Sequence, residues 1–332
     1  MKNEKTKFMR KISIVVACYN ESKNILELYK RVKKVFQDIN YDYELIFVDN
    51  ASLDNSRQIY QQIILQDKNV KALIMSRNFG SSQPSFFAGI KKATGDAVVM
   101  IDGDLQDPPE VILELINKWQ ERYEVVYAVR KKRKGSLLRR IGYKCFYRVF
   151  KWFSYLDIPL DAGDFSLVDK KVIDVIKNLD EKDLYIRGLR SWAGFKQVGI
   201  EYVRDDRVAG SSSNSFFANF SWAKKAIVNF SYKPLEFISR IAVISVFLTF
   251  FVALFYIYLH FKTNAPRGFS TLLMAVFIFG TIQLLALSVL AEYMIRIFQE
   301  VKNRPTYIIR EVLQSKEIEN FEKREKEKCI NI

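Results

Sequence analysis

Two long stretches without a charged side chain place the strongest constraint on how this chain can fold. Residues 241–261 and 269–291 contain no Asp, Glu, Lys or Arg. Each is long enough to cross a lipid bilayer as a helix, which takes about 20 residues. A helix buried in a soluble core is the alternative, but two such stretches in close succession favour a membrane hairpin. We therefore expect two transmembrane helices joined by a short loop.

Basic residues gather at the two outer ends of this hairpin. The connecting loop holds only Lys262 and Arg267, whereas eight basic residues flank the hairpin: Lys224, Lys225, Lys233, Arg240, Arg296, Lys302, Arg304 and Arg310. Cytoplasmic flanks of membrane helices carry such an excess of Lys and Arg. We expect a multi-pass protein of the cytoplasmic membrane, with both termini and the large N-terminal part in the cytoplasm.

Before the hairpin, short apolar runs alternate with amphipathic patterns typical of helices. We expect strands at residues 12–17, 43–48, 70–75, 97–101 and 124–129, with helices between them. This alternation predicts an α/β domain with a mostly parallel sheet covered on both faces. The expected divisions are the α/β domain over residues 1–212, interfacial amphipathic helices over 213–234, the hairpin over 235–297 and a cytoplasmic tail over 298–332.

The fourth apolar run ends in a cluster of acidic side chains. Asp102, Asp104 and Asp107 follow it, and two prolines then favour a turn into the next helix. Side chains at the carboxyl end of a strand in an open α/β sheet point into the crevice where ligands bind, and Gly103 would let a ligand approach the backbone. Asp102, Asp104 and the amide oxygen of Gln106 form an all-oxygen set suited to Mg²⁺ or Mn²⁺. An acidic loop that caps a helix is the alternative interpretation.

The chain carries a formal net charge of +15, which suggests an anionic partner. A basic run opens at Arg130 and ends at Arg140, beside the acidic cluster, which favours a phosphate or a lipid headgroup over a merely solvated loop. Residues 141–156 interleave aromatic and basic side chains, as in an amphipathic helix on a membrane or a core helix. Nucleic-acid binding is disfavoured, because the basic residues flank the apolar stretches and no nucleic-acid motif occurs.

Several strings of residues together resemble one enzyme family. The most specific is D-G-D-L-Q-D-P-P at residues 102–109. The others are V-V-A-C-Y-N-E at 15–21, D-N-A-S-L-D at 49–54, S-R-N-F-G at 76–80, A-G-D-F at 162–165, R-V-A-G-S-S-S at 207–213 and E-Y-M-I-R-I-F-Q-E-V-K-N-R-P at 292–305. From about residue 12 to 310 the chain resembles the polyprenyl-phosphate glycosyltransferases of the inverting GT-A, family-2 type, such as bactoprenol glucosyltransferases and dolichyl-phosphate mannose synthases. It departs from their pattern at Ala17, Asn50, Ala51 and Ser213, where that family usually has Pro, Asp, Gly and Lys.

The resemblance implies a GT-A domain, Rossmann-like with a mostly parallel sheet, that transfers a sugar from a nucleotide-sugar donor to a polyprenyl phosphate such as undecaprenyl phosphate. UDP-glucose is the expected donor, with UDP-N-acetylglucosamine, UDP-galactose and GDP-mannose as alternatives. The implied roles are donor binding by Tyr19, Glu21, Asp49, Asn50 and Asp102, acceptor-phosphate binding by Arg130, Arg207 and Arg140, and Mg²⁺ or Mn²⁺ binding by Asp102, Asp104 and Gln106. Through the metal, Asp104 also counts among the expected catalytic residues.

A general base, if the reaction needs one, would have to be a carboxylate. The only histidine is His260, at the outer end of the first apolar stretch. The A-G-D-F string makes Asp164 the candidate, with a loop or capping carboxylate as the alternative. A phosphate monoester has a second pKa near about 6, so at neutral pH the acceptor is mostly a dianion and needs positioning more than deprotonation. We therefore expect Asp164 to orient groups first and to act as a base second.

Two other functions agree with parts of the sequence. A processive family-2 polysaccharide synthase would have more membrane spans and a Q-x-x-R-W string, which this chain lacks. A catalytically silent membrane scaffold would not need an intact D-x-D-x-Q string. The lipid bilayer is an expected partner in every case, and self-association into a homo-oligomer is left open.

Overall fold

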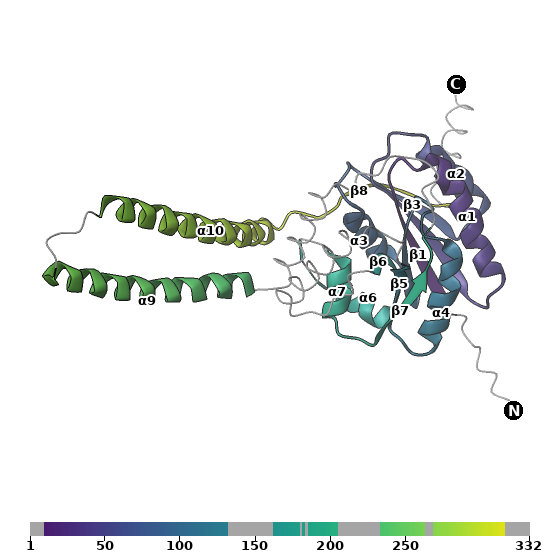
Figure 1. Cartoon of the computed structure of the whole chain (residues 1–332). Helices are drawn as coiled ribbons and strands as arrows, with labels where there is room; N and C mark the ends of the chain where they lie inside the picture. The colour runs from purple at the N-terminus through teal and green to yellow at the C-terminus, as the bar shows by residue number, and fades with distance from the viewer. Residues whose placement is uncertain are drawn as a thin grey trace, which may run out of the picture. The chain divides into compact units, whose positions relative to one another are not determined.

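The computed structural model describes residues 10–131, 162–179, 181–182, 185–204, 233–262 and 268–315. These residues fall into two units, each of which is described by itself. The first unit contains a β-sheet with its covering helices, and the second contains two long helices (Figure 1).

Eight strands form one sheet in the described part of the first unit, in the order β7-β5-β6-β4-β1-β2-β3-β8. The strands are β1 (Lys11–Cys18), β2 (Asp42–Asp49), β3 (Val70–Met75), β4 (Ala97–Asp102), β5 (Val125–Arg130), β6 (Ala162–Asp169), β7 (Gln197–Tyr202) and β8 (Ile309–Leu313). Most pairs are parallel, whereas β6 is antiparallel to β4 and β5, and β8 is antiparallel to β3. The expected mostly parallel sheet is confirmed. The strands β6, β7 and β8 were not expected from the sequence.

Helices cover both faces of this sheet, as the alternating pattern predicted. One face carries α1 (Ser22–Gln37), α2 (Ser56–Gln66) and α4 (Ile112–Gln120), which follows the short helix η1 (Pro109–Val111). The other face carries α3 (Ser82–Lys92), α6 (Lys170–Lys177) and α7 (Ile186–Trp192) (Figure 1). Because both faces are covered, central strands such as β1 are buried along nearly their whole length.

Close packing brings the carboxyl ends of the central strands together. Gly89 on α3 lies against Val15, and a Cβ there would come within 2.1 Å of a Val15 methyl carbon. Gly103 follows β4 and donates its backbone N–H to the Ala17 carbonyl at 2.9 Å. A Cβ on Gly103 would lie 2.7 Å from the Cys18 sulfur. The structure thus gives Gly103 a packing role between β4 and β1, which differs from the expected one of letting a ligand approach.

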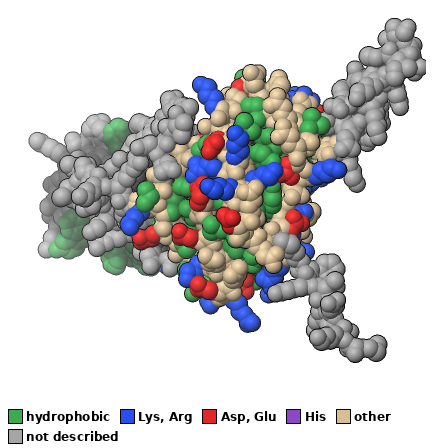
Figure 2. Space-filling model, turned by 90° about the vertical axis from the view of Figure 1, so that its right-hand side faces the viewer, with side chains coloured by type: hydrophobic (Ala, Val, Ile, Leu, Met, Phe, Trp, Pro, Cys, Tyr) green, Lys and Arg blue, Asp and Glu red, His purple; other side chains and the backbone are tan. Residues whose placement is uncertain are grey.

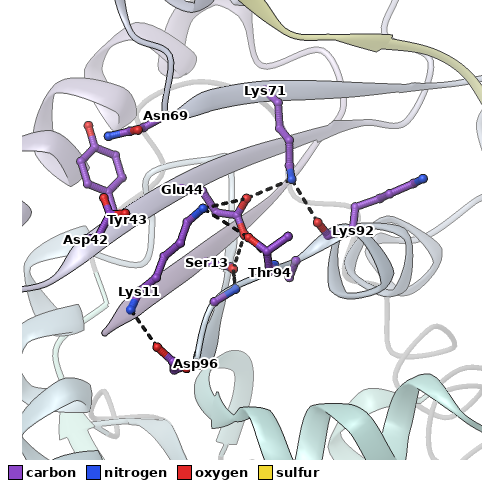
Figure 3. Close-up of polar contacts among 12 residues, drawn as sticks. Lys11, Ser13, Asp42, Tyr43, Glu44, Asn69, Lys71, Lys92, Thr94 and Asp96 are labelled. Atoms are coloured by element: carbon purple, nitrogen blue, oxygen red, sulfur yellow. Dashed lines mark hydrogen bonds and ion pairs between the residues drawn. The ribbon is translucent and has the colours of Figure 1, made fainter. Parts of the chain in front are cut away.

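At the other end of the strands, a buried carboxylate joins their amino-terminal halves (Figure 3). Glu44 accepts hydrogen bonds from the Ser13 hydroxyl at 2.6 Å, the Thr94 backbone N–H at 2.7 Å and the Lys71 ammonium at 3.0 Å. Burial alone raises the pKa of Glu44, but these bonds outweigh it and lower the pKa to about 2. Glu44 therefore stabilises the fold on the side of the sheet away from the strand ends that carry the acidic cluster.

The edge of the sheet beside β3 is closed by a segment from the far end of the sequence. β8 pairs antiparallel with β3, the Ser76 N–H donates to the Ile308 carbonyl at 2.9 Å, and Arg57 on α2 pairs with Glu311 at 2.7 Å. β8 thus takes the outermost place in the sheet and pairs backbone groups of β3 that would otherwise be exposed. The expected tail over residues 298–332 therefore contributes a strand to the sheet of the first unit at 309–313.

The face of the first unit that carries α1 and α2 mixes both signs of charge (Figure 2). Ion pairs on these helices include Arg31 with Glu110 and Lys33 with Asp67. Lys and Arg side chains alternate with Asp and Glu, as on an ordinary solvated surface. The excess positive charge of the chain therefore does not gather on this face.

The second unit contains α9 (Lys233–Lys262) and α10 (Phe269–Lys302). Their large apolar side chains are exposed; examples are Phe247 and Phe251 on α9 and Phe277 and Leu284 on α10. Both helices are long and apolar enough to cross a membrane, and a bilayer would cover the apolar side chains that the described residues leave exposed. The expected pair of candidate membrane-spanning helices is confirmed.

Candidate functional site

The candidate site lies at one edge of the sheet, the one formed by strand ends. The carboxyl ends of five strands meet the amino end of β6 there: β1, β2, β4, β5 and β7. In the parallel register Asp102 pairs with Ala17, and Asp49 pairs with Cys18. In the antiparallel register of β4 and β6, Met100 pairs with Ser166. Two residues farther along, the same register places Asp102 opposite Asp164. Residues from four separate expected motifs, at 15–21, 49–54, 102–109 and 162–165, are thus brought together here.

Four carboxylates lie close enough to influence one another electrostatically. Burial, followed by the charges of Asp164, Asp107 and Asp104, raises the pKa of Asp102 to about 8, and Arg204 lowers it. Carboxylates that share a site disfavour one another's ionised form. The edge is therefore a place where a cation would relieve repulsion between negative charges.

The loop after β4 presents its oxygen atoms on a tight turn. The Asp104 carboxylate accepts the Gln106 N–H at 3.1 Å, and Leu105 between them has a positive φ of 57° with its side chain buried. Within the described ranges, no group of three or more His, Cys, Asp and Glu side chains is arranged to hold a metal ion. Asp102, Asp104 and the amide oxygen of Gln106 instead fit Mg²⁺ or Mn²⁺ as a site of another type. Such a site uses one or two carboxylates, and substrate phosphates and water complete the coordination shell.

Asp164 is held by an arginine that the sequence analysis missed. Arg187 on α7 donates its Nε and one terminal nitrogen to the two Asp164 oxygens at 2.8 and 2.9 Å. Burial raises the pKa of Asp164, but the charge and hydrogen bonds of Arg187 outweigh it and lower the pKa below its usual value. Asp164 is thus an ionised carboxylate with a fixed orientation, which agrees with an orienting role.

A second arginine on α7 supports the same strand end. Arg190 is fully buried, donates to the Gly163 carbonyl at 3.1 Å and lies over the Tyr127 ring at 5.3 Å. Its burial lowers its pKa to about 10. Gln83 on α3 accepts the Ile186 N–H at 2.9 Å and so fixes the start of α7. The spacing of Arg187 and Arg190, three residues apart on a helix, was the signal available in the sequence.

The end of β7 contacts the acidic loop from the other side. The Tyr202 hydroxyl donates a short hydrogen bond to the buried Asp107 carboxylate, and Arg204 Nε donates to the same carboxylate at 3.0 Å. A terminal nitrogen of Arg204 lies 4.0 Å from Asp104. Neither Tyr202 nor Arg204 was predicted as a site residue. Asp107 therefore serves to join the loop to β7.

Arg130, the first candidate for the acceptor phosphate, lies at this edge. Its Nε is 3.4 Å from the Tyr202 hydroxyl, and a Cβ on Gly163 would lie 3.4 Å from its terminal nitrogen. Arg130 is half-buried beside the start of β6. The structure thus places it next to the carboxylate cluster, where a phosphate group could meet a guanidinium.

The expected donor-binding residues that follow β1 and end β2 divide into two kinds. Tyr19 is 42% exposed, and Glu21 precedes α1 and accepts a hydrogen bond from Asn24 at 2.6 Å. Asp49 is buried, accepts the Ser52 N–H at 2.7 Å, and has its pKa raised by burial. Tyr19 and Glu21 are therefore better placed to contact a ligand directly than Asp49.

Asn50 uses its side chain to hold a neighbouring loop. Its carbonyl oxygen accepts the Phe79 N–H at 2.9 Å, and its amide donates to the Asn78 side chain at 3.2 Å. The loop at 76–80 is thus fastened to the end of β2. This positioning role was not expected from the sequence, and donor binding by Asn50 stays a prediction.

Some expectations lie outside the described residues. They concern Arg140, Arg207, Ser213, the aromatic segment 141–156 and the interfacial segment 213–232.

Comparison with known proteins identifies the family. Residues 13–176 match the family described as Glycosyl transferase family 2. An uncharacterized glycosyltransferase of Bacillus subtilis is 44% identical over 299 residues, which are 90% of this chain and 92% of that protein. The SfII prophage-derived bactoprenol glucosyl transferase of Shigella flexneri is 38% identical over 304 residues, 90% of this chain and 97% of that protein.

Two further matches are more distant. A prophage bactoprenol glucosyl transferase homolog of Escherichia coli is 36% identical over 305 residues, 91% of this chain and 99% of that protein. The crystal structure of mannosyl-3-phosphoglycerate synthase from Rubrobacter xylanophilus has a TM-score of 0.48 and 14% identity, over 70% of this chain and 75% of that one. Since full-length relatives are well above 30% identical, this chain belongs to glycosyltransferase family 2.

Proposed function

We propose that this glycosyltransferase moves glucose from UDP-glucose to undecaprenyl phosphate at the cytoplasmic face of the membrane, with inversion at the sugar carbon. The product would be a polyprenyl-phosphate-linked sugar for modification of envelope glycans. The observation that carries the proposal is the meeting of Asp102, Asp104, the Asp164–Arg187 pair and Arg130 at one edge of the sheet. Relatives named bactoprenol glucosyl transferases, similar over nearly the whole chain, support the lipid acceptor.

The departing nucleoside diphosphate is the group whose charge must be stabilised. Asp102 and Asp104, with the amide oxygen of Gln106, would hold Mg²⁺ or Mn²⁺, which when bound neutralises the developing charge on the diphosphate. Tyr19 is exposed after β1, the strand that pairs with β4, and it offers a ring for the nucleobase. Glu21 offers a carboxylate to the ribose hydroxyls. The donor would therefore lie across the ends of β1, β2 and β4.

The acceptor phosphate would approach from the side of β5 and β6. Arg130 is the described arginine placed to bind it, with Arg207 and Arg140 as the further candidates. Because the phosphate arrives mostly ionised, Asp164 has to orient groups rather than remove a proton. Both Asp164 oxygens are already bonded to Arg187. Asp164→Asn should therefore keep a measurable rate, whereas the loss of an obligate base would abolish the rate at every pH.

The membrane helices would keep the enzyme at the surface where its acceptor lies. In the proposed topology α9 and α10 span the bilayer, residues 263–267 face the outside, and both termini are cytoplasmic. The basic flanks of the hairpin support this orientation.

The decisive experiment is a transfer assay with the full chain in lipid nanodiscs. Four donors would be compared at equal concentration with undecaprenyl phosphate and Mg²⁺: UDP-glucose, UDP-N-acetylglucosamine, UDP-galactose and GDP-mannose. Mass spectrometry should detect a lipid phosphate carrying one hexose, formed fastest from UDP-glucose.

Undecaprenol, which has the same chain but no phosphate, is the matched control and should not react. Preference for another donor would show that the transferred sugar is not glucose. Polymeric products, or donor hydrolysis without any lipid-linked sugar, would contradict the proposal.

A further inference from the structure

Arg204 is a positive charge placed inside the acidic cluster. It lies two residues beyond the end of β7, and its side chain is 27% exposed. It donates to the Asp107 carboxylate at 3.0 Å and lies 4.0 Å from a carboxylate oxygen of Asp104. Its charge also acts on Asp102. A single guanidinium thus lies beside Asp104 and acts through its charge on Asp102, the two carboxylates of the proposed metal site.

The two contacts of Arg204 differ in kind. The contact with Asp107 is a charge-assisted hydrogen bond, and Asp107 is buried and also bonded to Tyr202. The contact with Asp104 is longer than a hydrogen bond. Asp104 can therefore take a cation without any loss of the hydrogen bond that holds Arg204 to Asp107, so Arg204 stays near the cation.

A guanidinium in this position affects the two parts of the donor complex in opposite ways. It repels a divalent cation that arrives alone at Asp102 and Asp104, because like charges a few ångströms apart destabilise each other. It attracts a diphosphate, since arginine is well suited to bind phosphate oxygens. The net effect depends on whether the cation comes alone or together with the nucleotide.

We propose that Arg204 is the resident counter-charge of this site and couples cation binding to donor binding. It weakens the binding of a divalent cation by itself and favours the cation and the nucleoside diphosphate together. Asp107 and Tyr202 position Arg204 for this purpose. The inference rests on the proposed metal site at Asp102 and Asp104.

The test is Mn²⁺ affinity, measured by the electron paramagnetic resonance signal of free Mn²⁺ with the full chain in detergent. In the absence of nucleotide, Arg204→Gln and Arg204→Met should bind Mn²⁺ about tenfold more tightly than wild type, because a nearby positive charge has been removed. Arg204→Lys keeps the charge and should bind as wild type does. Arg57→Gln, which removes an arginine from the surface pair with Glu311, is the control and should change nothing.

The second arm measures the coupling with UDP. Mn²⁺ should raise UDP affinity strongly in wild type and by a smaller factor in the two neutral variants, and the reverse effect of UDP on Mn²⁺ must be equal. Because Arg204 is partly exposed, these variants should fold, and near-ultraviolet circular dichroism checks this. Two neutral substitutions of different shape keep the test valid if one of them misfolds.

The outcomes separate this inference from the proposed function. Unchanged or weaker Mn²⁺ binding in folded neutral variants, or a Lys variant that behaves like Gln, would overturn the role of Arg204 alone. Failure of wild type to bind Mn²⁺ even with UDP would overturn the metal site and this inference with it.

Discussion

Removal of the Arg187 side chain tests whether α7 holds Asp164 in place. Arg187→Met keeps most of the apolar stem and removes the guanidinium. Both hydrogen bonds to Asp164, at 2.8 and 2.9 Å, are lost, and the carboxylate stays buried beside Asp102. Loss of one partner of a buried ion pair costs about 3–5 kcal/mol. Since the Arg187 side chain is 30% exposed, we expect the lower end, about 3 kcal/mol.

Thermal unfolding of the full chain in detergent, followed by tryptophan fluorescence, measures this cost. For a domain of this size, about 3 kcal/mol corresponds to a Tm about 6–12 °C lower. Arg57→Met removes an exposed arginine from its pair with Glu311 and should cost less than about 1 kcal/mol. The double variant of Arg187→Met with Asp164→Asn should lose clearly less stability than the two single losses added, because the uncompensated charge is gone.

The dependence of this loss on pH has a definite sign. The pKa of Asp164 is lowered in the folded wild type, so its contribution to stability is present above the unfolded pKa of about 3.9 and is lost as the pH falls below it. In Arg187→Met the buried carboxylate lacks this partner and gains stability by taking up a proton. The stability difference should therefore be largest near pH 8 and narrow as the pH falls. Additive single losses, or a difference that is constant from pH 8 to 4, would refute the coupling.

Four further outcomes are expected. Asp104→Ala should abolish transfer in the folded, membrane-bound enzyme, and full activity of this variant, or of wild type in excess chelator, would exclude the metal site. Arg130→Ala should raise the acceptor KM about ten- to 100-fold, the equivalent of a charge-assisted contact of about 1.5–3 kcal/mol, with the donor KM little changed; the reverse pattern would assign Arg130 to the donor. A cysteine replacing Thr263 should react with an impermeant reagent from outside the cell and one replacing Lys5 should not, and the opposite labelling would reverse the topology. Glu44→Gln should cost about 2–3 kcal/mol at pH 7, and the cost should vanish as the pH falls from about 4.5 to 2, because the folded wild type keeps this carboxylate ionised to about pH 2; denaturant titrations over that range check it.

Local patterns in the sequence determined the central part of the fold. β3 begins and ends at the predicted residues, and β1, β2, β4 and β5 differ from prediction by one residue at one or both ends. These elements have strong apolar periodicity. The spacing of apolar residues reflects whether one face or both faces are buried, and it distinguishes a helix from a strand within a few residues. The two uncharged stretches predicted the long apolar helices α9 and α10 equally clearly. The acidic side chains at the end of β4 could be placed at the ligand edge because a strand end is a local feature.

The tertiary structure alone decided which side chains meet at that edge. β6, β7 and β8 have no strong pattern of their own and exist as strands because partners distant in sequence supply their hydrogen bonds. Arg187 and Asp164 are 23 residues apart, and Arg204 and Asp107 are 97 apart. An ionic contact of this kind depends on strand order, register and direction, and none of these is written in the residues that make the contact. The sequence therefore determined the acidic cluster and the membrane helices, whereas only the folded sheet brought Arg187, Arg204 and Tyr202 to the cluster, because charges pair according to their distance in space and not along the chain.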